Sequence, residues 1–136
     1  MTKAKTKPKS HPERERAEQI VAAALGTKAA DILVYDMEQR SAITDYVVIC
    51  SGRSQAHVRG IAEKIDAALS AQGVRYSSIE GFQEGSWVLL DYDLVIVHIF
   101  HPETRGFYDL ESLLASYPCE RVASPAPDAD DSTPAA

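Results

Sequence analysis

The residues most suggestive of chemistry are a glycine–serine pair and an Asp-x-Asp triplet that lie close together in the chain. The pair is Gly85-Ser86, and the triplet is Asp91-Tyr92-Asp93. In metal-dependent nucleotidyl transfer, two carboxylates at strand ends hold divalent cations, and a Gly-Ser loop holds the triphosphate of the nucleotide. The spacing of Asp91 and Asp93 suits the metal-binding half of such a site.

The phosphate-binding half of this site is missing. Only four residues separate Ser86 from Asp91, too few for a helix to carry a phosphate loop and return to a strand. The sequence also contains no Gly-x-Gly-x-x-Gly motif and no P-loop. We therefore interpret Asp91-Tyr92-Asp93 as a hairpin turn, where aspartate tolerates a left-handed backbone. The alternative is nucleotide binding, or residual metal-dependent nucleotidyl transfer, through Asp91 and Asp93.

The cysteines and histidines form no recognisable catalytic or metal-binding set. Cys50 ends an apolar run and is expected in the core. Cys119 lies beside the predicted C-terminal tail. His98 and His101 fall on opposite faces of the expected strand, so they cannot hold one metal ion together. The sequence therefore predicts a protein that is not an enzyme, with no catalytic residue, no metal site and no cofactor.

Trp87 is the only tryptophan, and it begins a predicted strand. Because side chains alternate along a strand, one face carries Trp87, Leu89 and Asp91. The opposite face of the strand carries the alternate residues Val88, Leu90 and Tyr92. Large apolar groups on both faces mean that helices cover both or that one face binds a partner. Tryptophan and tyrosine are frequent at interface hot spots, so core packing and partner contact both remain open for Trp87.

Apolar residues at steps of three and four predict two long helices. The first spans 11–25. The second begins after Ser54, a favourable N-cap, and ends by Gly73. A shorter helix is predicted over 107–116. These helices must pack against the strands that carry the aspartates and the tryptophan.

Runs of β-branched and aromatic residues predict five strands. They span 32–35, 45–50, 74–79, 87–90 and 94–100. The run 45–50 has almost no polar alternation, as expected of a strand buried on both faces. We expect a β–α–β crossover with parallel strands over 45–79, followed by an antiparallel hairpin. The predicted fold class is α/β (α+β), a mixed sheet of about five strands flanked by helices.

The chain has 136 residues, which fits one domain. We expect a domain over 10–118 between a basic disordered tail, 1–9, and an acidic Pro/Ala/Asp-rich disordered tail, 119–136. Without the charges of 1–9 and 124–136, the chain holds 10 basic and 17 acidic residues. Phosphate backbones repel an acidic body, which favours a basic protein partner over direct, sequence-specific binding of nucleic acid.

The sequence also predicts where the protein works. No apolar run reaches the roughly 20 residues that span a bilayer, and no signal peptide is recognisable at the N-terminus. Two cysteines without metal-site spacing fit a reducing compartment. We therefore expect a cytoplasmic protein that does not bind a membrane.

Three segments, taken together in order and spacing, resemble the ribosomal silencing factor family, RsfS, also called Iojap-like. They are SAITDYVVICSGRSQAHVRGIAEKI (41–65), GSWVLLDYDLVIVHIF (85–100) and TRGFYDLESLL (104–114). The resemblance implies a nucleotidyltransferase-like scaffold without transferase activity. It also implies binding to large-subunit ribosomal protein uL14 on the intersubunit face, which sterically blocks subunit joining and represses translation under nutrient limitation.

The resemblance further implies a partner-binding surface centred on Trp87, Leu89 and Asp91. Further candidates for this surface are Thr44, Asp45, Tyr92, Phe107, Tyr108 and Glu111. The chain departs from the family pattern twice. Asp93-Leu94 stands where the family usually has Gly-Asp, and Leu113-Leu114 stands where it often has a tryptophan. A homodimer formed through a sheet edge is a further expectation for the free protein.

Overall fold

A single open sheet forms the centre of the molecule in the computed structural model, which describes residues 12–38 and 44–122. Its strands are β1 (Ala30–Asp36), β2 (Tyr46–Ser51), β3 (Ser78–Glu80), β4 (Trp87–Asp91), β5 (Val95–Phe100) and β6 (Cys119–Val122). Their order across the sheet is β3-β4-β5-β2-β1-β6. Strands β2 and β5 are parallel, and the other neighbouring pairs are antiparallel. The predicted mixed sheet is confirmed.

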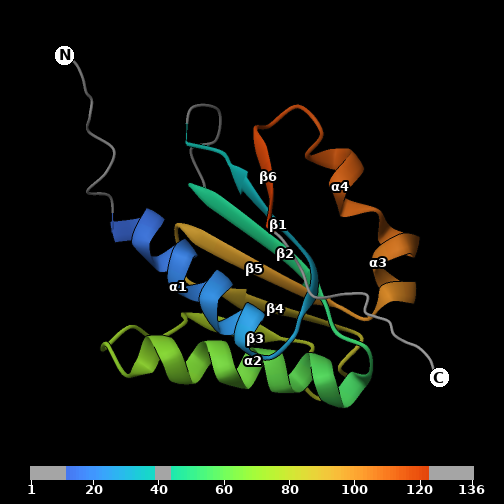
Figure 1. Ribbon diagram of the computed structural model, residues 1–136, viewed down its shortest axis with the longest axis horizontal. Coiled ribbons are helices and arrows are strands. Elements are labelled where there is room, and N and C mark those ends of the chain that lie inside the picture. Colours follow the sequence, from blue (N-terminus) through green and yellow to red (C-terminus); the bar gives the residue numbers. More distant parts are fainter. Residues whose placement is uncertain (1–11, 39–43, 123–136) are drawn as a thin grey trace.

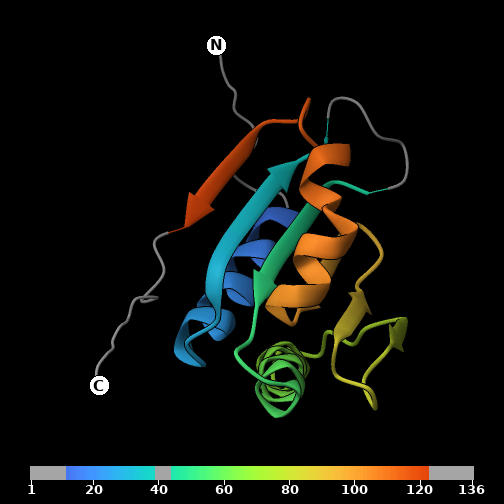
Figure 2. The same cartoon turned by 90° about the vertical axis from the view of Figure 1, so that its right-hand side faces the viewer.

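Helices cover both faces of this sheet. They are α1 (Pro12–Gly26), α2 (Gln55–Ser70), α3 (Pro102–Tyr108) and α4 (Leu110–Leu113). Helices α1 and α2 lie along one face (Figure 1), and α3 and α4 lie on the opposite face (Figure 2). The predicted flanking by helices is therefore confirmed. No helix of the described ranges is long and apolar enough to cross a bilayer.

Alternation along the central strands builds one core on each face. On β5, Val95, Val97 and Ile99 join the core under α1 and α2, whereas Phe100 joins the core under α3 and α4. Strand β2 is buried at every position, as its unbroken apolar run predicts, because it lies between β5 and β1 with helices on both faces.

Helix α2 has the predicted start and the predicted buried stripe. The Ser54 hydroxyl accepts a hydrogen bond from the backbone N–H of His57 at 3.0 Å, which satisfies a free donor of the first turn. Val58, Ile61 and Ile65 are fully buried against the sheet. The chain then turns at Gly73, whose φ is +80°, a left-handed conformation that favours glycine.

The strand predicted over 74–79 is wrong for most of its length. Only Ser78–Glu80 pairs with β4, at one edge of the sheet. Val74 and Tyr76 instead pack against the core without strand pairing, and their alternation with polar residues imitates a strand. Strands β2 and β3 run in the same direction, as the crossover predicts, but β5 and β4 lie between them.

The helix predicted over 107–116 is also misplaced. It begins at Pro102, with His101 as N-cap, and it is interrupted at Asp109, whose φ is +49°. Proline is tolerated in the first helical turn because its missing N–H would have no intrahelical partner there.

Strand β6 was not predicted, and it raises the count to six strands. It extends the folded part beyond the expected boundary at 118, because Ile32 to Tyr35 of β1 pair with it along the sheet edge. Its four residues, Cys119–Val122, are too few and too polar to produce a strand pattern. Of the tails expected at 1–9 and 119–136, residues 1–9 and 123–136 lie outside the described residues.

Candidate partner-binding surface

Trp87 is the first residue of β4 and pairs with Phe100 of β5. Its indole Nε1–H donates a hydrogen bond to Nδ1 of His98 at 3.0 Å. The ring centroid lies 4.9 Å from that of Phe100 and 4.7 Å from that of Tyr108. Trp87 is therefore half-buried, with its orientation set by a strand neighbour and by α3.

His98 is a partner of this tryptophan that sequence reasoning missed, because strand alternation shows a shared face but not a hydrogen bond. Burial lowers the pKa of His98 to about 4. The imidazole is thus neutral at neutral pH, and Nδ1 is free of a proton to accept from the indole. A neutral acceptor beneath Trp87 keeps a charge out of the surrounding aromatic cluster.

The two faces of β4 divide as the alternation predicts. Trp87, Leu89 and Asp91 are half-exposed on the face that carries α3 and α4. The alternate residues are buried in the other core: Val88, Leu90 and Tyr92. Tyr92 is only 1% exposed, which contradicts its proposed role as a partner contact. The tyrosine ring instead lies edge-on to Tyr76 in the core.

Helix α3 brings two further predicted residues beside Trp87. Phe107 is 80% exposed and Tyr108 is 53% exposed, and their rings meet at an interplanar angle of 89°. A hollow of about 690 Å³ lies between α3 and the start of β4. It is lined by Glu84, Ser86, Trp87, Glu103, Thr104, Phe107 and Tyr108. Large exposed aromatic groups beside an open hollow are typical of a protein-binding site.

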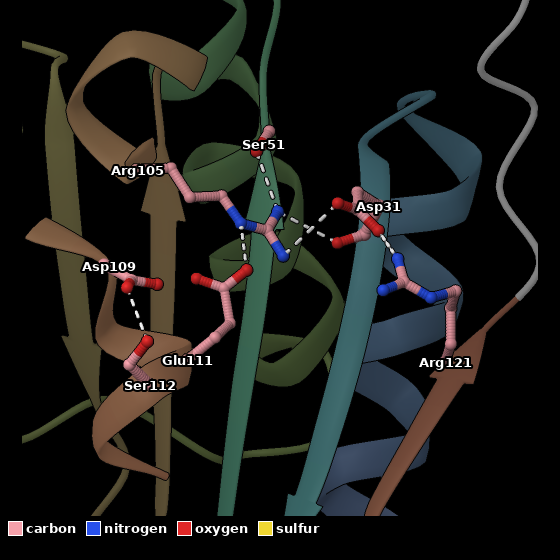
Figure 3. A network of polar contacts seen from close by, with 7 residues as sticks. All are labelled: Asp31, Ser51, Arg105, Asp109, Glu111, Ser112 and Arg121. Atoms are coloured by element: carbon pink, nitrogen blue, oxygen red, sulfur yellow. Dashed lines mark hydrogen bonds and ion pairs between the residues drawn. The ribbon is translucent and has the colours of Figure 1, made fainter. Parts of the chain in front are cut away.

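A buried arginine anchors α3 to the sheet (Figure 3). The Arg105 guanidinium donates to the Ser51 hydroxyl at 2.8 Å, to the carbonyl of Asp31 at 2.9 Å and to the Glu111 carboxylate at 2.9 Å. Burying this charge is tolerated because the guanidinium is hydrogen-bonded and paired with carboxylates. Glu111, a predicted contact residue, thus serves to hold α3, and through it Phe107 and Tyr108, in place.

Thr44 and Asp45 do not lie near Trp87. They precede β2 at the end that pairs with Val95, whereas Trp87 pairs with Phe100, five residues further along β5 and about 17 Å away. Thr44 is 7% exposed, and its hydroxyl donates to the Leu94 carbonyl at 2.9 Å. Thr44 therefore has a structural role, which contradicts its prediction as a contact residue.

The acidic triplet forms the predicted hairpin turn. Asp91 accepts a hydrogen bond from the backbone N–H of Asp93 at 2.7 Å, and Asp93 accepts one from the Ser77 hydroxyl at 2.9 Å. Asp93 has a φ of +71°, the left-handed conformation that aspartate tolerates in a turn. Within the described residues, no group of three or more potential ligands could hold a metal ion.

The other departure from the family pattern leaves an apolar side chain on the surface. Leu113, in α4, is 75% exposed, whereas Leu114 packs against the core beneath it. Leu94, the other half of the first departure expected from the resemblance, is partly exposed beside the hairpin turn. The exposed aromatic and aliphatic groups of α3 and α4 thus lie on the same side of the sheet as Trp87.

Comparison with known proteins gives one consistent result. The family model described as "Ribosomal silencing factor during starvation" matches residues 8–136. Ribosomal silencing factor RsfS of Bacillus subtilis is 43% identical over 100 residues, which cover 73% of this chain and 85% of that protein. The chloroplastic Iojap protein of Zea mays is 35% identical over 89 residues, covering 65% of this chain and 39% of that longer protein.

Solved structures show the same fold. A crystal structure of a Chromobacterium violaceum protein superposes with a TM-score of 0.75 at 25% identity, covering 88% of this chain and 97% of that one. A Bacillus halodurans protein superposes with a TM-score of 0.71 at 31% identity, covering 80% and 99% of the two chains.

Proposed function

The chain belongs to the ribosomal silencing factor (RsfS) family, whose members regulate translation at the ribosome, and from this premise we propose how it acts. It binds the large ribosomal subunit through protein uL14 on the intersubunit face. The bound domain sterically blocks subunit joining and so represses translation when nutrients are limiting. Its action is that of a cytoplasmic binding protein, not of an enzyme.

The observation that carries this proposal is the aromatic surface formed by Trp87, Phe107 and Tyr108. Phe107 and Tyr108 expose most of their rings, although water-exposed aromatic area is unfavourable in a free protein. Trp87 and α3 are held by internal hydrogen bonds, so little conformational freedom is lost on binding. A preorganised aromatic centre of this kind supports a protein–protein hot spot.

The size and charge of the domain support a steric mechanism. A specific interface buries roughly 800 Å² on each partner, an area that a small domain can supply from one face. The acidic excess of the chain, with a net charge of −6, favours a basic protein over exposed ribosomal RNA. Occupation of the joining face of the large subunit then excludes the small subunit without any chemical step.

Binding to isolated large subunits tests the function and the surface together. Phe107→Ala removes an 80% exposed ring, so the fold should remain intact while the affinity falls about tenfold or more. Leu25→Ala is the matched control, because Leu25 is a partly exposed apolar residue on α1, which covers the opposite face. Co-sedimentation measures affinity, and reassociation of the two ribosomal subunits measures repression.

Two outcomes would contradict the proposal at different points. If the unmodified chain neither sediments with large subunits nor slows subunit reassociation, the proposed function is wrong. If it binds, but Phe107→Ala binds equally well, the surface assignment is wrong and the function stands.

We further propose that the free protein forms a homodimer through one edge of the sheet. Strands β3 and β6 are the two edges, and each is hydrogen-bonded to one neighbouring strand only within the described residues. Open edges are ready to pair with a second copy. Light scattering over a range of protein concentrations tests this, and a constant monomeric mass would reject it.

A further inference from the structure

The hollow between α3 and the start of β4 has the composition of a site for an organic cation. We propose that it receives one arginine side chain of the protein partner. This inference rests on the proposed function and adds the chemistry of the residue that the surface recognises.

The charge of the hollow is the first argument. Its lining contains two glutamates, Glu84 and Glu103, and no basic residue. No ion pair or side-chain hydrogen bond engages either carboxylate within the described ranges, in contrast to Glu111, which is bound by Arg105. The guanidinium of Arg59 donates to the Gln83 carbonyl at 3.1 Å and does not line the hollow. Two carboxylates without an ion-pair partner at one hollow favour a cationic occupant and disfavour phosphate.

The aromatic walls are the second argument. Trp87 and Tyr108 lie with ring centroids 4.7 Å apart, and Phe107 stands perpendicular to Tyr108 at 5.0 Å. The negative face of an aromatic ring attracts a cation positioned over it. A hollow that combines such rings with carboxylates can therefore hold the flat face and the charged edge of one ligand at once.

This combination selects arginine over lysine. A guanidinium is planar, stacks on aromatic rings and donates paired N–H groups to a carboxylate, and it is more weakly hydrated than an ammonium. A lysine ammonium would lose more hydration on entering the hollow and would gain no stacking. The open volume of about 690 Å³ accommodates a long side chain together with bridging water.

The hollow is also held in shape before binding. Glu84 lies in the loop between Gly81 and Gly85, which is closed by a backbone hydrogen bond of 3.0 Å from Gly85 to Gly81. Glu103 lies in the first turn of α3, which Arg105 anchors to the sheet. The carboxylates therefore start from rigid backbone positions, which reduces the cost of ordering them around an arginine.

The first experiment measures affinity for large ribosomal subunits as a function of salt concentration. Glu84→Gln and Glu103→Gln keep side-chain size and remove charge, and each should weaken binding about tenfold at low salt and flatten the salt dependence. Glu120→Gln, at an exposed position of β6 outside the hollow, should leave affinity and salt dependence unchanged. Unchanged binding by both hollow variants would overturn the inference.

The second experiment needs no ribosome. N-acetyl-arginine methylamide, its lysine counterpart and its uncharged citrulline counterpart are titrated into the full chain. The nuclear magnetic resonance signals of the Trp87 indole and the Phe107 ring report occupancy. We expect the arginine probe to shift these signals at several-fold lower concentration than the lysine probe, and the citrulline probe to leave them unchanged.

Each failure has a distinct meaning. Equal shifts by the arginine and lysine probes, or no shift by any probe, would overturn the arginine assignment. Failure of the unmodified chain to bind large subunits would overturn the proposed function, whereas the probe titration reports on the hollow alone.

Discussion

The indole of Trp87 donates its N–H to His98 and packs against Phe100 and Tyr108, so only part of the ring remains available to a partner. Of the two interpretations that the strand pattern leaves open for Trp87, the structure shows internal packing, and partner contact stays a proposal. The proposed partner contact at Trp87 should therefore cost little side-chain entropy.

His98 should make the stability of the protein depend on pH. An unfolded histidine has a pKa near 6.5, and burial lowers the pKa of His98 to about 4. As pH falls from about 6.5 to about 4, His98 takes up a proton in the unfolded chain but not in the folded chain, so the free energy of unfolding decreases. The loss should be at most on the order of 3 kcal/mol, and it is complete below about pH 4.

Urea unfolding followed by Trp87 fluorescence at neutral and acidic pH measures this effect. His98→Gln retains a hydrogen-bond acceptor that does not titrate, so its stability should depend less on pH than that of the unmodified chain. His101→Asn, which replaces the Nδ1 acceptor at the start of α3 with an amide oxygen, serves as the control. An equally steep pH dependence in His98→Gln would assign the effect to other groups.

At the scale of elements, the loop before β4 depends on two glycines with left-handed backbones, Gly81 and Gly85. A Cβ atom added at Gly81 would lie 2.0 Å from the carbonyl oxygen of Trp87. We expect Gly81→Ala to lower the free energy of unfolding by about 2 kcal/mol or more, since it combines a steric clash with an unfavourable φ.

Gly60→Ala is the matched control for this substitution. Gly60 lies within α2, and an added Cβ would meet no atom within 4 Å. Alanine should therefore stabilise the protein by roughly 0.5–1 kcal/mol through its helix propensity. Denaturant unfolding of both variants checks the pair, and equal effects of the two substitutions would show that the loop tolerates a side chain.

The elements also differ in how well their sequences predict them. Helix α2 and strand β2 were predicted closely because a long apolar period or an unbroken apolar run leaves few competing structures. The strand expected over 74–79 failed because Val74 and Tyr76 bury their side chains without pairing. Helix α3 was misplaced because Pro102 can either end a strand or open a helix, and only packing of the following turn decides between them.

At the scale of the whole molecule, β6 links the end of the described chain to the anchor of α3. Arg121 of β6 forms an ion pair with Asp31, which also lies 3.6 Å from the Arg105 guanidinium. A chain that ends at Val122 should therefore be more stable than one that ends at Pro118, by about 2 kcal/mol or more, since the shorter chain loses four strand residues and exposes β1.

Thermal unfolding of the two truncated chains measures this difference. Arg121→Ala in the chain that ends at Val122 separates the ion pair from the strand. Because Arg121 is exposed, the substitution should cost less than about 1 kcal/mol. Equal stability of the two truncated chains would show that β6 contributes nothing to the fold.

The sequence by itself determined the mixed sheet with its flanking helices, the division of β4 into two faces, the hairpin turn at Asp91 to Asp93 and the family resemblance. These features follow from local periodicity, turn chemistry and motif spacing, all of which act between residues close in the chain. They place Trp87, Leu89 and Asp91 on the same face of β4 without any knowledge of the packing.

Only the tertiary structure decided which predicted contact residues are accessible. It buried Tyr92 and Thr44, paired Glu111 with Arg105, and brought Phe107 and Tyr108 to Trp87 from a helix fifteen or more residues further along the chain. It also joined Glu84 and Glu103 at one hollow. Contacts between residues so far apart depend on how the elements pack, because packing, and not local pattern, sets the distance between side chains of different elements.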